Sequence, residues 1–398
     1  MKNNKVVLAF SGGLDTSYCL KYLVNEKKLE AYSAIVNTGG FSEDELKQLE
    51  EKAYTLGATQ HICLQETEAY YEKIIKYLIY GNVLKNNTYP LSVSAERVYQ
   101  AISLVKYAKQ INAGYIAHGS TGAGNDQVRF DLIFHLIAPE IKILTPTRDL
   151  QLSRENEILY LKKNGFEINL KTSEYSINKG LWGTSVGGKE TLTSHQSLPE
   201  NAYPSQLIET KPKQIKIEFR NGELYGLNRK KMTPIACIQS LEAIAKEYAI
   251  GRDIHVGDTI IGIKGRVGFE AAAASIIIKA HHHLEKHTLS KWQLHYKEQI
   301  ASWYGMFIHE SQYLDPVMRN LEAFLEDSQK YVSGIVNIEL HPYRFNILGI
   351  KSEHDLMNPE FGSYGEMNRD WSSDDVKGFT KILANPIRIF NKVNKISC

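Results

Sequence analysis

The fold is decided near the N-terminus by the stretch Val6-Val7-Leu8-Ala9-Phe10-Ser11-Gly12-Gly13-Leu14-Asp15-Thr16-Ser17. Its first five residues form an apolar run that is typical of a strand buried on both faces. After the two glycines, apolar residues recur with the spacing of one helix face, at Cys19, Leu20, Leu23 and Val24. A glycine loop between a buried strand and a helix predicts the first unit of an α/β sheet.

The alternation of strands and helices continues to about residue 165. We expect further strands at 31–36, 61–64, 115–117 and 141–144, and helices that begin at Ser42, near Val98 and at Ser153. Ser42 precedes Glu45 by three residues, a capping-box pattern, and Gly57 is placed to end that helix. Short loops between such units predict a parallel sheet with helices on both faces.

The pattern changes after residue 165. Residues 171–211 are rich in Ser, Thr, Gly, Asn and Pro, and so long a polar, irregular stretch indicates substrate-binding loops. We then expect hairpins at 215–227 and 335–350, a helix from Thr233 to Ile250, and more helices over 270–330. After residue 360 an apolar patch in a polar segment, at Phe379, Ile382 and Leu383, indicates an arm that docks elsewhere.

Composition excludes several classes of protein. The chain has 398 residues, 43% of them hydrophobic and 23% charged, which is ordinary for a soluble globular protein of two or three domains. A net charge of +2 without a long Lys/Arg run argues against nucleic acid as the main partner. We expect no membrane span or signal peptide, and a cytoplasmic location. Four cysteines lack zinc-site spacing and are expected to be free thiols: Cys19, Cys63, Cys237 and Cys398.

The loop from Ser11 to Ser17 predicts phosphate binding. Its glycines let the backbone approach an anion, and its hydroxyls add donors to the first amides of the helix. Neither the Gly-Lys-[Ser/Thr] of a Walker A loop nor G-x-G-x-x-G occurs here. Asp15 inside such a loop suits Mg²⁺ bound to the phosphates. The structural alternative is a tight turn in which Thr16 or Ser17 only caps the helix.

A second glycine-rich loop, Ala117 to Phe130, follows the strand expected at 115–117. Glycines at 119, 122 and 124 again permit close approach, and four polar residues lie among them: Thr121, Asn125, Asp126 and Arg129. In a parallel sheet both loops open at the carboxyl edge, where ligands bind. Alone, such a loop could be a surface turn with a solvated Asp–Arg pair; beside the first loop it predicts a ligand site.

The first loop resembles the pyrophosphate loop of the N-type ATP pyrophosphatases. The strings AFSGGLDTS (9–17), AHGSTGAGNDQVRFD (117–131) and, more loosely, LWGTS (181–185) resemble argininosuccinate synthase. That family joins citrulline to aspartate through a citrulline adenylate and converts ATP to AMP and pyrophosphate. The resemblance implies an adenine nucleotide alpha hydrolase-like domain over 1–165, an α+β synthetase domain over 166–360, and an oligomerisation arm over 361–398 in a homotetramer.

The resemblance also implies a role for each matched residue. ATP would contact Ala9, Phe10, Ser11, Gly12, Gly13, Leu14, Asp15, Thr16, Ser17, Val36, Ala117, His118 and Gly119. Aspartate would contact Thr121, Asn125 and Asp126, and citrulline would contact Tyr89, Ser94, Asn125, Arg129, Ser176 and Ser185. The expected catalytic residues are Asp15, through Mg²⁺, with Asp126 and Arg129.

Other functions remain open at this level. Another pyrophosphate-loop ligase would share the first loop, whereas a tRNA sulfurtransferase needs reactive cysteines and a basic face that the sequence does not display. Amidotransferase relatives often carry a catalytic cysteine in a preceding domain, and no cysteine precedes Cys19. A catalytically inactive nucleotide sensor would not need both loops intact.

The chain departs from the family at two positions, Gly257 and Phe269, where the family has a citrulline-binding Glu and a Tyr. The stretch 187–196 departs as well. One explanation is that a neighbouring acid, Asp258 or Glu270, has taken over, or that the alignment slips by one residue. The other is that the α-nitrogen of the acceptor is acylated and carries no charge, so that an acyl carboxylate would meet one of three nearby groups, His255, Lys264 or Arg266.

Overall fold

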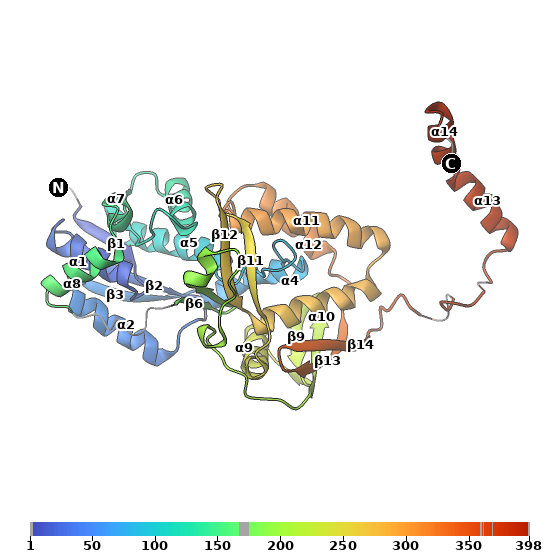
Figure 1. Ribbon diagram of the computed structural model, residues 1–398, viewed down its shortest axis with the longest axis horizontal. Coiled ribbons are helices and arrows are strands. Elements are labelled where there is room, and N and C mark those ends of the chain that lie inside the picture. Colours follow the sequence, from blue (N-terminus) through green and yellow to red (C-terminus); the bar gives the residue numbers. More distant parts are fainter. Residues whose placement is uncertain (1–2, 167–174, 359, 361, 368, 397–398) are drawn as a thin grey trace. The chain divides into compact units, whose positions relative to one another are not determined.

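The computed structural model describes residues 3–166, 175–358, 360, 362–367 and 369–396, and separates the chain into two units, Met1–His354 and Asp355–Cys398. The first unit opens with a five-stranded parallel sheet of order β3-β2-β1-β4-β5 (Figure 1). Its strands are β1 (Lys5–Ala9), β2 (Glu30–Asn37), β3 (Gln60–Gln65), β4 (Tyr115–Ala117) and β5 (Lys142–Leu144). The predicted α/β class is confirmed.

Helices pack on both faces of this sheet because its strands are apolar on both faces. Val6 and Leu8 join a core with residues of α1 (Leu14–Asn25) and α2 (Glu43–Leu56). Val7, which points the opposite way, joins a core with residues of α5 (Ser94–Gln110) and α6 (Asp126–Ile137). The unbroken apolar run of β1 therefore results from burial on both sides.

The predicted helix ends are confirmed where they depend on local chemistry. Ser42 and Glu45 form the reciprocal capping box of α2, and Gly57 ends that helix in the left-handed region with φ 103°. Ser153 accepts a hydrogen bond from the amide of Asn156 and begins α8 (Arg154–Lys163). These residues fix the directions in which the helices leave the sheet.

A second, antiparallel sheet follows, of order β10-β9-β8-β13-β14. It contains both predicted hairpins: β8 (Lys213–Arg220) with β9 (Glu223–Leu227), and β13 (Gly334–His341) with β14 (Arg344–Lys351); β10 is Lys230–Lys231. The accompanying helices are α9 (Pro234–Ala245), α10 (Ala272–Thr288), α11 (Lys291–His309) and α12 (Val317–Asp327). The helix expected to reach Ile250 ends earlier, because a 3-10 turn follows it and Ala249 adopts φ 53°.

A four-stranded sheet of order β11-β12-β7-β6 was not predicted. Its strands are β6 (Ser176–Gly180), β7 (Gly183–Gly187), β11 (Arg252–Asp258) and β12 (Lys264–Glu270). The described part of 171–211 thus contains a hairpin rather than only irregular loops, while 171–174 lie outside the described residues. Trp182, in its turn, is buried and donates to the carbonyl of Pro90 over 3.0 Å, which ties the hairpin to the core.

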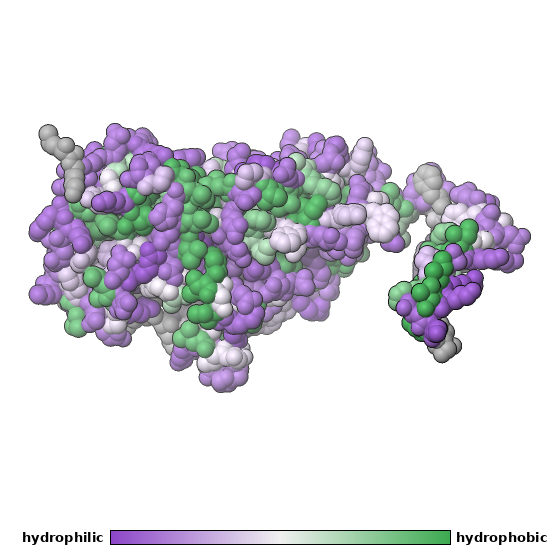
Figure 2. All heavy atoms as spheres, turned by 90° about the horizontal axis from the view of Figure 1, so that it is seen from above, coloured by the Kyte–Doolittle hydropathy of each residue, from purple (hydrophilic) through white to green (hydrophobic). Residues whose placement is uncertain are grey.

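The second unit contains α13 (Ser373–Leu383) and α14 (Asn385–Val393), in which no described residue is buried. Phe379, Ile382 and Leu383 are exposed, and Figure 2 shows hydrophobic atoms gathered along these helices. The unit begins at Asp355, a few residues before the predicted arm. The predicted division at residue 165 falls inside the first unit, and both domain boundaries remain predictions.

Candidate active site

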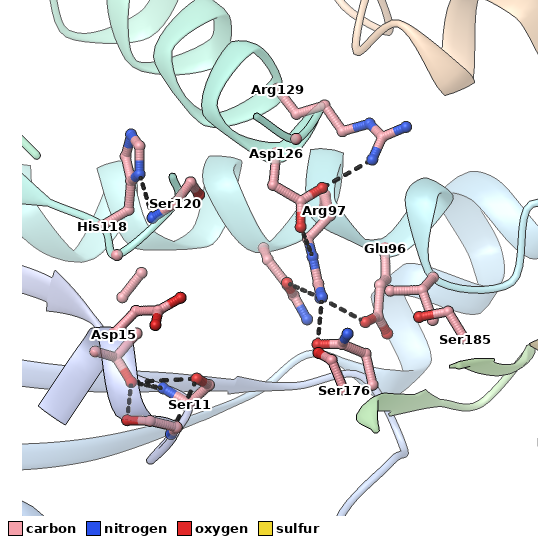
Figure 3. A pocket seen from close by; sticks show the side chains of 18 of the residues that line it. Ser11, Asp15, Glu96, Arg97, His118, Ser120, Asp126, Arg129, Ser176 and Ser185 are labelled. Carbon is pink, nitrogen blue, oxygen red and sulfur yellow. Dashed lines mark hydrogen bonds and ion pairs between the residues drawn. The ribbon is translucent and has the colours of Figure 1, made fainter. Parts of the chain in front are cut away.

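One large cleft opens where the strand order of the parallel sheet reverses. β1 lies between β2 and β4, so the loops after β1 and β4 leave the sheet on opposite sides of a switch point. The cleft has a volume of about 1340 Å³ and is lined by both predicted loops, by Tyr89 and Ser94, and by residues of β6, β7, β11 and β12. Figure 3 shows polar side chains from both loops, from α5 and α6, and from β6 and β7 around this cleft.

The first loop leaves the N-terminus of α1 open to an anion. Gly13 is the N-cap, and no side chain caps the helix, so the alternative in which Thr16 or Ser17 acts as a cap is wrong. The hydroxyls of Ser11 and Thr16 lie 3.2 Å apart, and Gly12 turns the loop with φ 73°. Free amides, hydroxyls and the positive end of the helix dipole make this an anion site.

The two loops touch at Gly119. A Cβ placed there would lie 3.0 Å from Thr16 Cγ2 and 3.1 Å from the backbone nitrogen of Thr16. The neighbouring His118 is held by two bonds: its Nδ1 accepts from the amide of Ser120 over 3.2 Å, so Nε2 carries the proton and donates to Asp131 over 2.9 Å. A glycine at 119 therefore brings the second loop against the first.

Arg97 lies at the centre of the cleft. Its Nη1 donates to Glu96 over 2.7 Å and its Nε to Asp126 over 3.0 Å. Nη2 donates to Asn178 of β6 over 3.0 Å, which joins α5, α6 and the third sheet through one guanidinium (Figure 3). Only 12% of the Arg97 side chain is exposed, so the guanidinium is held by these partners rather than solvated.

Asp126 remains ionised in this setting. Burial alone would raise the pKa of its carboxyl, but Arg97 and then Arg129 lower that pKa to about 2. Arg129 donates from Nη1 to Asp126 over 2.8 Å and from Nε to the carbonyl of His309 over 3.0 Å, and no described residue bonds to its Nη2. Asn125 accepts from the amide of Ile260 through Oδ1, so its NH₂ group remains a free donor.

Tyr89 and Ser94, which carry hydroxyl groups, also line the cleft. Tyr89 accepts from the amides of Val93 and Ser94 over 3.3 and 3.4 Å, which places its ring beside the start of α5. The buried Ser94 hydroxyl has no hydrogen-bond partner among the described residues, although Ser94 lines the cleft. An orphaned hydroxyl at a cleft wall is a group that a ligand can satisfy.

The carboxyl groups of Asp15 and Glu157 lie close enough to influence each other. Glu157 is buried, and burial followed by the charge of Asp15 raises its pKa to about 7. Its Oε1 accepts from Thr147 over 2.9 Å. Asp15 lines the cleft, and no lysine or arginine pairs with it in the part of the chain that the structure describes. Its carboxylate is therefore available to a cation.

Most predicted site residues line the cleft, including Thr121, Ser176 and Ser185. Ser17 and Ala117 do not: both are buried behind the loops that they flank. The sequence missed Lys52, which contacts the carbonyl of Gly12, and the central place of Arg97 and Glu96. Lys52 lies on α2, and nothing in the sequence around it indicates that its side chain contacts the carbonyl of Gly12.

These features define an α/β protein with an anion-binding loop at the sheet's switch point and a polar cleft beside it. Residues 5–167 match the family model described as arginosuccinate synthase N-terminal HUP domain, and residues 175–390 match the arginosuccinate synthase C-terminal domain. The chain belongs to the argininosuccinate synthase family, whose members are ligases that bind ATP.

Relatives named argininosuccinate synthase match the chain over most of its length. The protein of Dictyoglomus thermophilum is 37% identical over 386 residues, covering 96% of each chain. That of Methanocaldococcus jannaschii is 36% identical over 92% of each chain, and that of Xanthomonas campestris is 32% identical over 99% of this chain and 100% of its own. No described helix is long and apolar enough to cross a membrane.

Proposed function

We propose that the chain activates the ureido oxygen of a citrulline-type acceptor with ATP and transfers the acceptor to aspartate, as the name of its family implies. The ureido oxygen attacks the α-phosphorus, and pyrophosphate leaves. The amino group of aspartate then attacks the ureido carbon, AMP leaves with the ureido oxygen, and the amino group gives up a proton. The observation that carries this proposal is the uncapped N-terminus of α1 facing the cleft that contains the Arg97–Asp126 pair.

The first loop would hold the phosphates that leave. The free amides at the start of α1, the hydroxyls of Ser11 and Thr16, and the ammonium of Lys52 supply donors and positive charge. Apolar residues at the carboxyl end of β1 and β2 would contact the adenine, namely Phe10, Ile35 and Val36. In this arrangement Ser17 and Ala117 support the pocket from behind rather than touch ATP.

Mg²⁺ fits this loop. No cluster of three or more His, Cys, Asp or Glu suited to a metal occurs within the described residues, but Mg²⁺ in phosphate sites uses one or two carboxylates and phosphate oxygens. The carboxylate of Asp15 has no cationic partner there and would hold the ion. The ion would offset the charge of the phosphates.

The second loop would hold aspartate. Asp126, ionised between two arginines, is an acceptor for the ammonium of aspartate, while Thr121 and the free NH₂ group of Asn125 are donors for its carboxylates. The acceptor substrate would lie between Arg129, Ser94 and Ser185, where Arg129 keeps Nη2 free. Tyr89 and Ser176 complete that wall. Asp126 and Arg129 would thus touch the reacting molecules.

Assembly and location are also part of the proposal. The exposed apolar residues of α13 and α14 suit docking on a second copy, in keeping with a homotetramer, and the free thiols Cys19, Cys63 and Cys237 suit the cytoplasm. Cys398 lies outside the described residues.

The test is product analysis. With ATP, Mg²⁺, aspartate and a ureido acceptor, the purified protein should release AMP and pyrophosphate in equal amounts, and pyrophosphate release should stop without the acceptor. Release of ADP and orthophosphate would overturn the proposal. An inactive nucleotide sensor would bind ATP and release neither product.

A further inference from the structure

The wall of the cleft opposite Arg129 is formed by the ribbon of β11 and β12. Cross-strand partners in an antiparallel ribbon point to the same face. His255 pairs with Val267 and Gly257 pairs with Gly265, and all four residues line the cleft. This wall therefore presents one imidazole, one isopropyl group and a patch of bare backbone.

Both nearby acids are paired with cations. Asp258 follows Gly257 and also lines the cleft, but its carboxylate pairs with its cross-strand partner Lys264 over 2.7 Å. Glu270 is bound by Arg252 over 2.8 Å and by Ser205 over 2.8 Å, and does not line the cleft. The explanation in which one of these acids takes over an ammonium-binding role is therefore not supported.

The other acids of the cleft are committed elsewhere. Among the described residues five acids line it, and besides Asp258 these are Asp15, Glu45, Glu96 and Asp126. Asp15 and Glu45 belong to the nucleotide end, where Glu45 closes the capping box of α2. Glu96 and Asp126 are held by arginines, and Asp126 serves aspartate in the proposed reaction. Thus no lining carboxylate in the described chain is free to pair with an ammonium at the acceptor end.

Positive groups surround the same end instead. Burial, followed by Arg129, Lys85 and His255, lowers the pKa of the His309 imidazole to about 2. Burial and Lys85 lower the pKa of His255, so its ring is neutral at neutral pH. Glu310 is the remaining acid nearby, but it accepts from Gln312 and does not line the cleft. An ammonium placed here would face Arg129 and Lys85, and the acids nearest to these cations already act as their counter-charges, Asp126 for Arg129 and Glu310 and Asp258 for Lys85.

The imidazole of His255 fills the position that a side chain at 257 would take. Its Nε2 lies 2.6 Å from a Cβ built on Gly257. The ring stacks on Tyr89 with centroids 5.3 Å apart, and Tyr89 in turn packs on Phe269 at 5.3 Å. No described residue bonds to the buried Nδ1 of His255. A neutral imidazole offers one donor and one acceptor, which matches an amide.

We propose that the acceptor carries an acyl group on its α-nitrogen, and that the resulting amide lies over Gly257 and Gly265 beside His255. This inference rests on the proposed function and specifies the acceptor of the same site. The wall carries no charged side chain at Gly257 or Gly265, and the His255 ring, which occupies the place of a Gly257 side chain, is the group that would meet the amide. Lys264 is bound to Asp258, and Arg266 donates to the carbonyls of Glu190 and Gln196, so neither is free for an acyl carboxylate.

The experiment compares kcat/KM for citrulline, N-acetyl-citrulline and N-succinyl-citrulline by pyrophosphate release with the full chain, ATP, Mg²⁺ and aspartate. We expect at least one acylated acceptor to exceed citrulline by tenfold or more, and the acetyl and succinyl arms report whether the acyl group ends in a methyl or a carboxylate. Any smaller difference, or a preference for citrulline, overturns the inference while the proposed function stands. If no acceptor supports pyrophosphate release, the proposed function is overturned, and the inference with it.

A pair of variants checks the position. His255→Ala combined with Gly257→Glu places a carboxylate on the wall and removes the clashing ring. It should shift the ratio of kcat/KM toward free citrulline by tenfold or more. His255→Ala with Gly257→Gln has the same size without the charge and should not produce that shift. Equal ratios in both double variants, each with a wild-type-like melting curve, would overturn the assignment of this wall.

Discussion

Arg97 of α5 donates from Nε to the carboxylate of Asp126, the first residue of α6, over 3.0 Å. Arg129, one helical turn further on, contacts the other oxygen of the same carboxylate over 2.8 Å. The acid is therefore held from two sides, and its charge is fixed where the second glycine loop meets the cleft. Charge-assisted bonds to a planar guanidinium orient a carboxylate more firmly than bonds to an ammonium do.

Arg97→Lys should weaken aspartate binding. A single ammonium cannot reach Glu96, Asp126 and Asn178 together, so we expect the KM for aspartate to rise by roughly tenfold, with the KM for ATP nearly unchanged. The measurement is initial-rate kinetics at saturating ATP. The exposed Arg220→Lys is the matched control. An unaltered aspartate KM would refute the role of Arg97 in positioning Asp126.

Asp15→Asn should lower kcat without unfolding the chain. Loss of the carboxylate that is expected to hold Mg²⁺ should reduce kcat by about 10²-fold at saturating substrates. Glu51→Gln, on an exposed part of α2, controls for the loss of one negative charge. Circular dichroism checks the fold. A kcat equal to that of the wild type would remove Asp15 from the catalytic set.

Gly119→Ala should separate the two loops. The added methyl group would lie 3.0 Å from Thr16 Cγ2 and 3.1 Å from the nitrogen of Thr16, so the second loop must shift and the KM for ATP should rise by roughly tenfold or more. Gly124→Ala, in the same loop, is the control, because no atom lies within 4 Å of its added Cβ. Equal ATP kinetics in both variants would contradict the close approach at Gly119.

Glu157→Gln should change the pH dependence of stability. The pKa of Glu157 is about 7 in the folded chain against an ordinary value of 4.5, so the folded state keeps a proton that the unfolded state loses. The stability that this proton supplies is complete below about pH 4.5 and is lost as the pH rises through about 7. From about pH 5 to pH 8 the wild type should therefore lose about 2–3 kcal/mol relative to the Gln variant.

Melting temperatures of the two proteins across this pH range give the comparison. Glu155→Gln, two residues away on α8, is the control: backbone hydrogen bonding lowers the pKa of the exposed Glu155, so it stays ionised throughout the range. Its difference from the wild type should be constant. A parallel pH course for Glu157→Gln would show that Glu157 is ionised in the folded chain at neutral pH.

Truncation after Gly362 should reduce the solution mass. It removes α13 and α14, whose large apolar residues are exposed, with Phe379, Ile382 and Leu383 among them. Light scattering of the truncated and full-length chains measures the change. Replacing the exposed charges Lys377 and Asp374 by Ser in the full chain should leave the mass unaltered. A truncated chain that keeps the full oligomer would refute the docking role of the arm.

The sequence predicts elements whose signals are local. Ser42, Gly57 and Ser153 end or begin helices through bonds to residues within one turn, so their pattern is readable without the fold. The buried strand β1 and both glycine loops are predicted for the same reason. Together these features locate the nucleotide end of the cleft and indicate the family to which the chain belongs.

The third sheet could not be predicted in this way. β6 and β7 contain glycines and polar residues, and Val186 is buried through contacts with distant residues, in a cluster with Leu198 and Ala202. Arg97 likewise has no local signal: its partners Asp126 and Asn178 are distant in the chain. Tertiary contacts, rather than periodicity, determine these parts of the site.

The bare pair Gly257 and Gly265 belongs to a different sheet from the loops that approach the phosphates. The residues proposed to select the acceptor and those proposed to bind the nucleotide therefore lie on separate sheets. Single substitutions in β11 or β12 can therefore change acceptor selectivity without altering the loops that approach the phosphates. An inhibitor that packs against the His255 ring and Gly265 would accordingly discriminate this chain from any relative with a bulky residue at either glycine, whereas a nucleotide mimic would not.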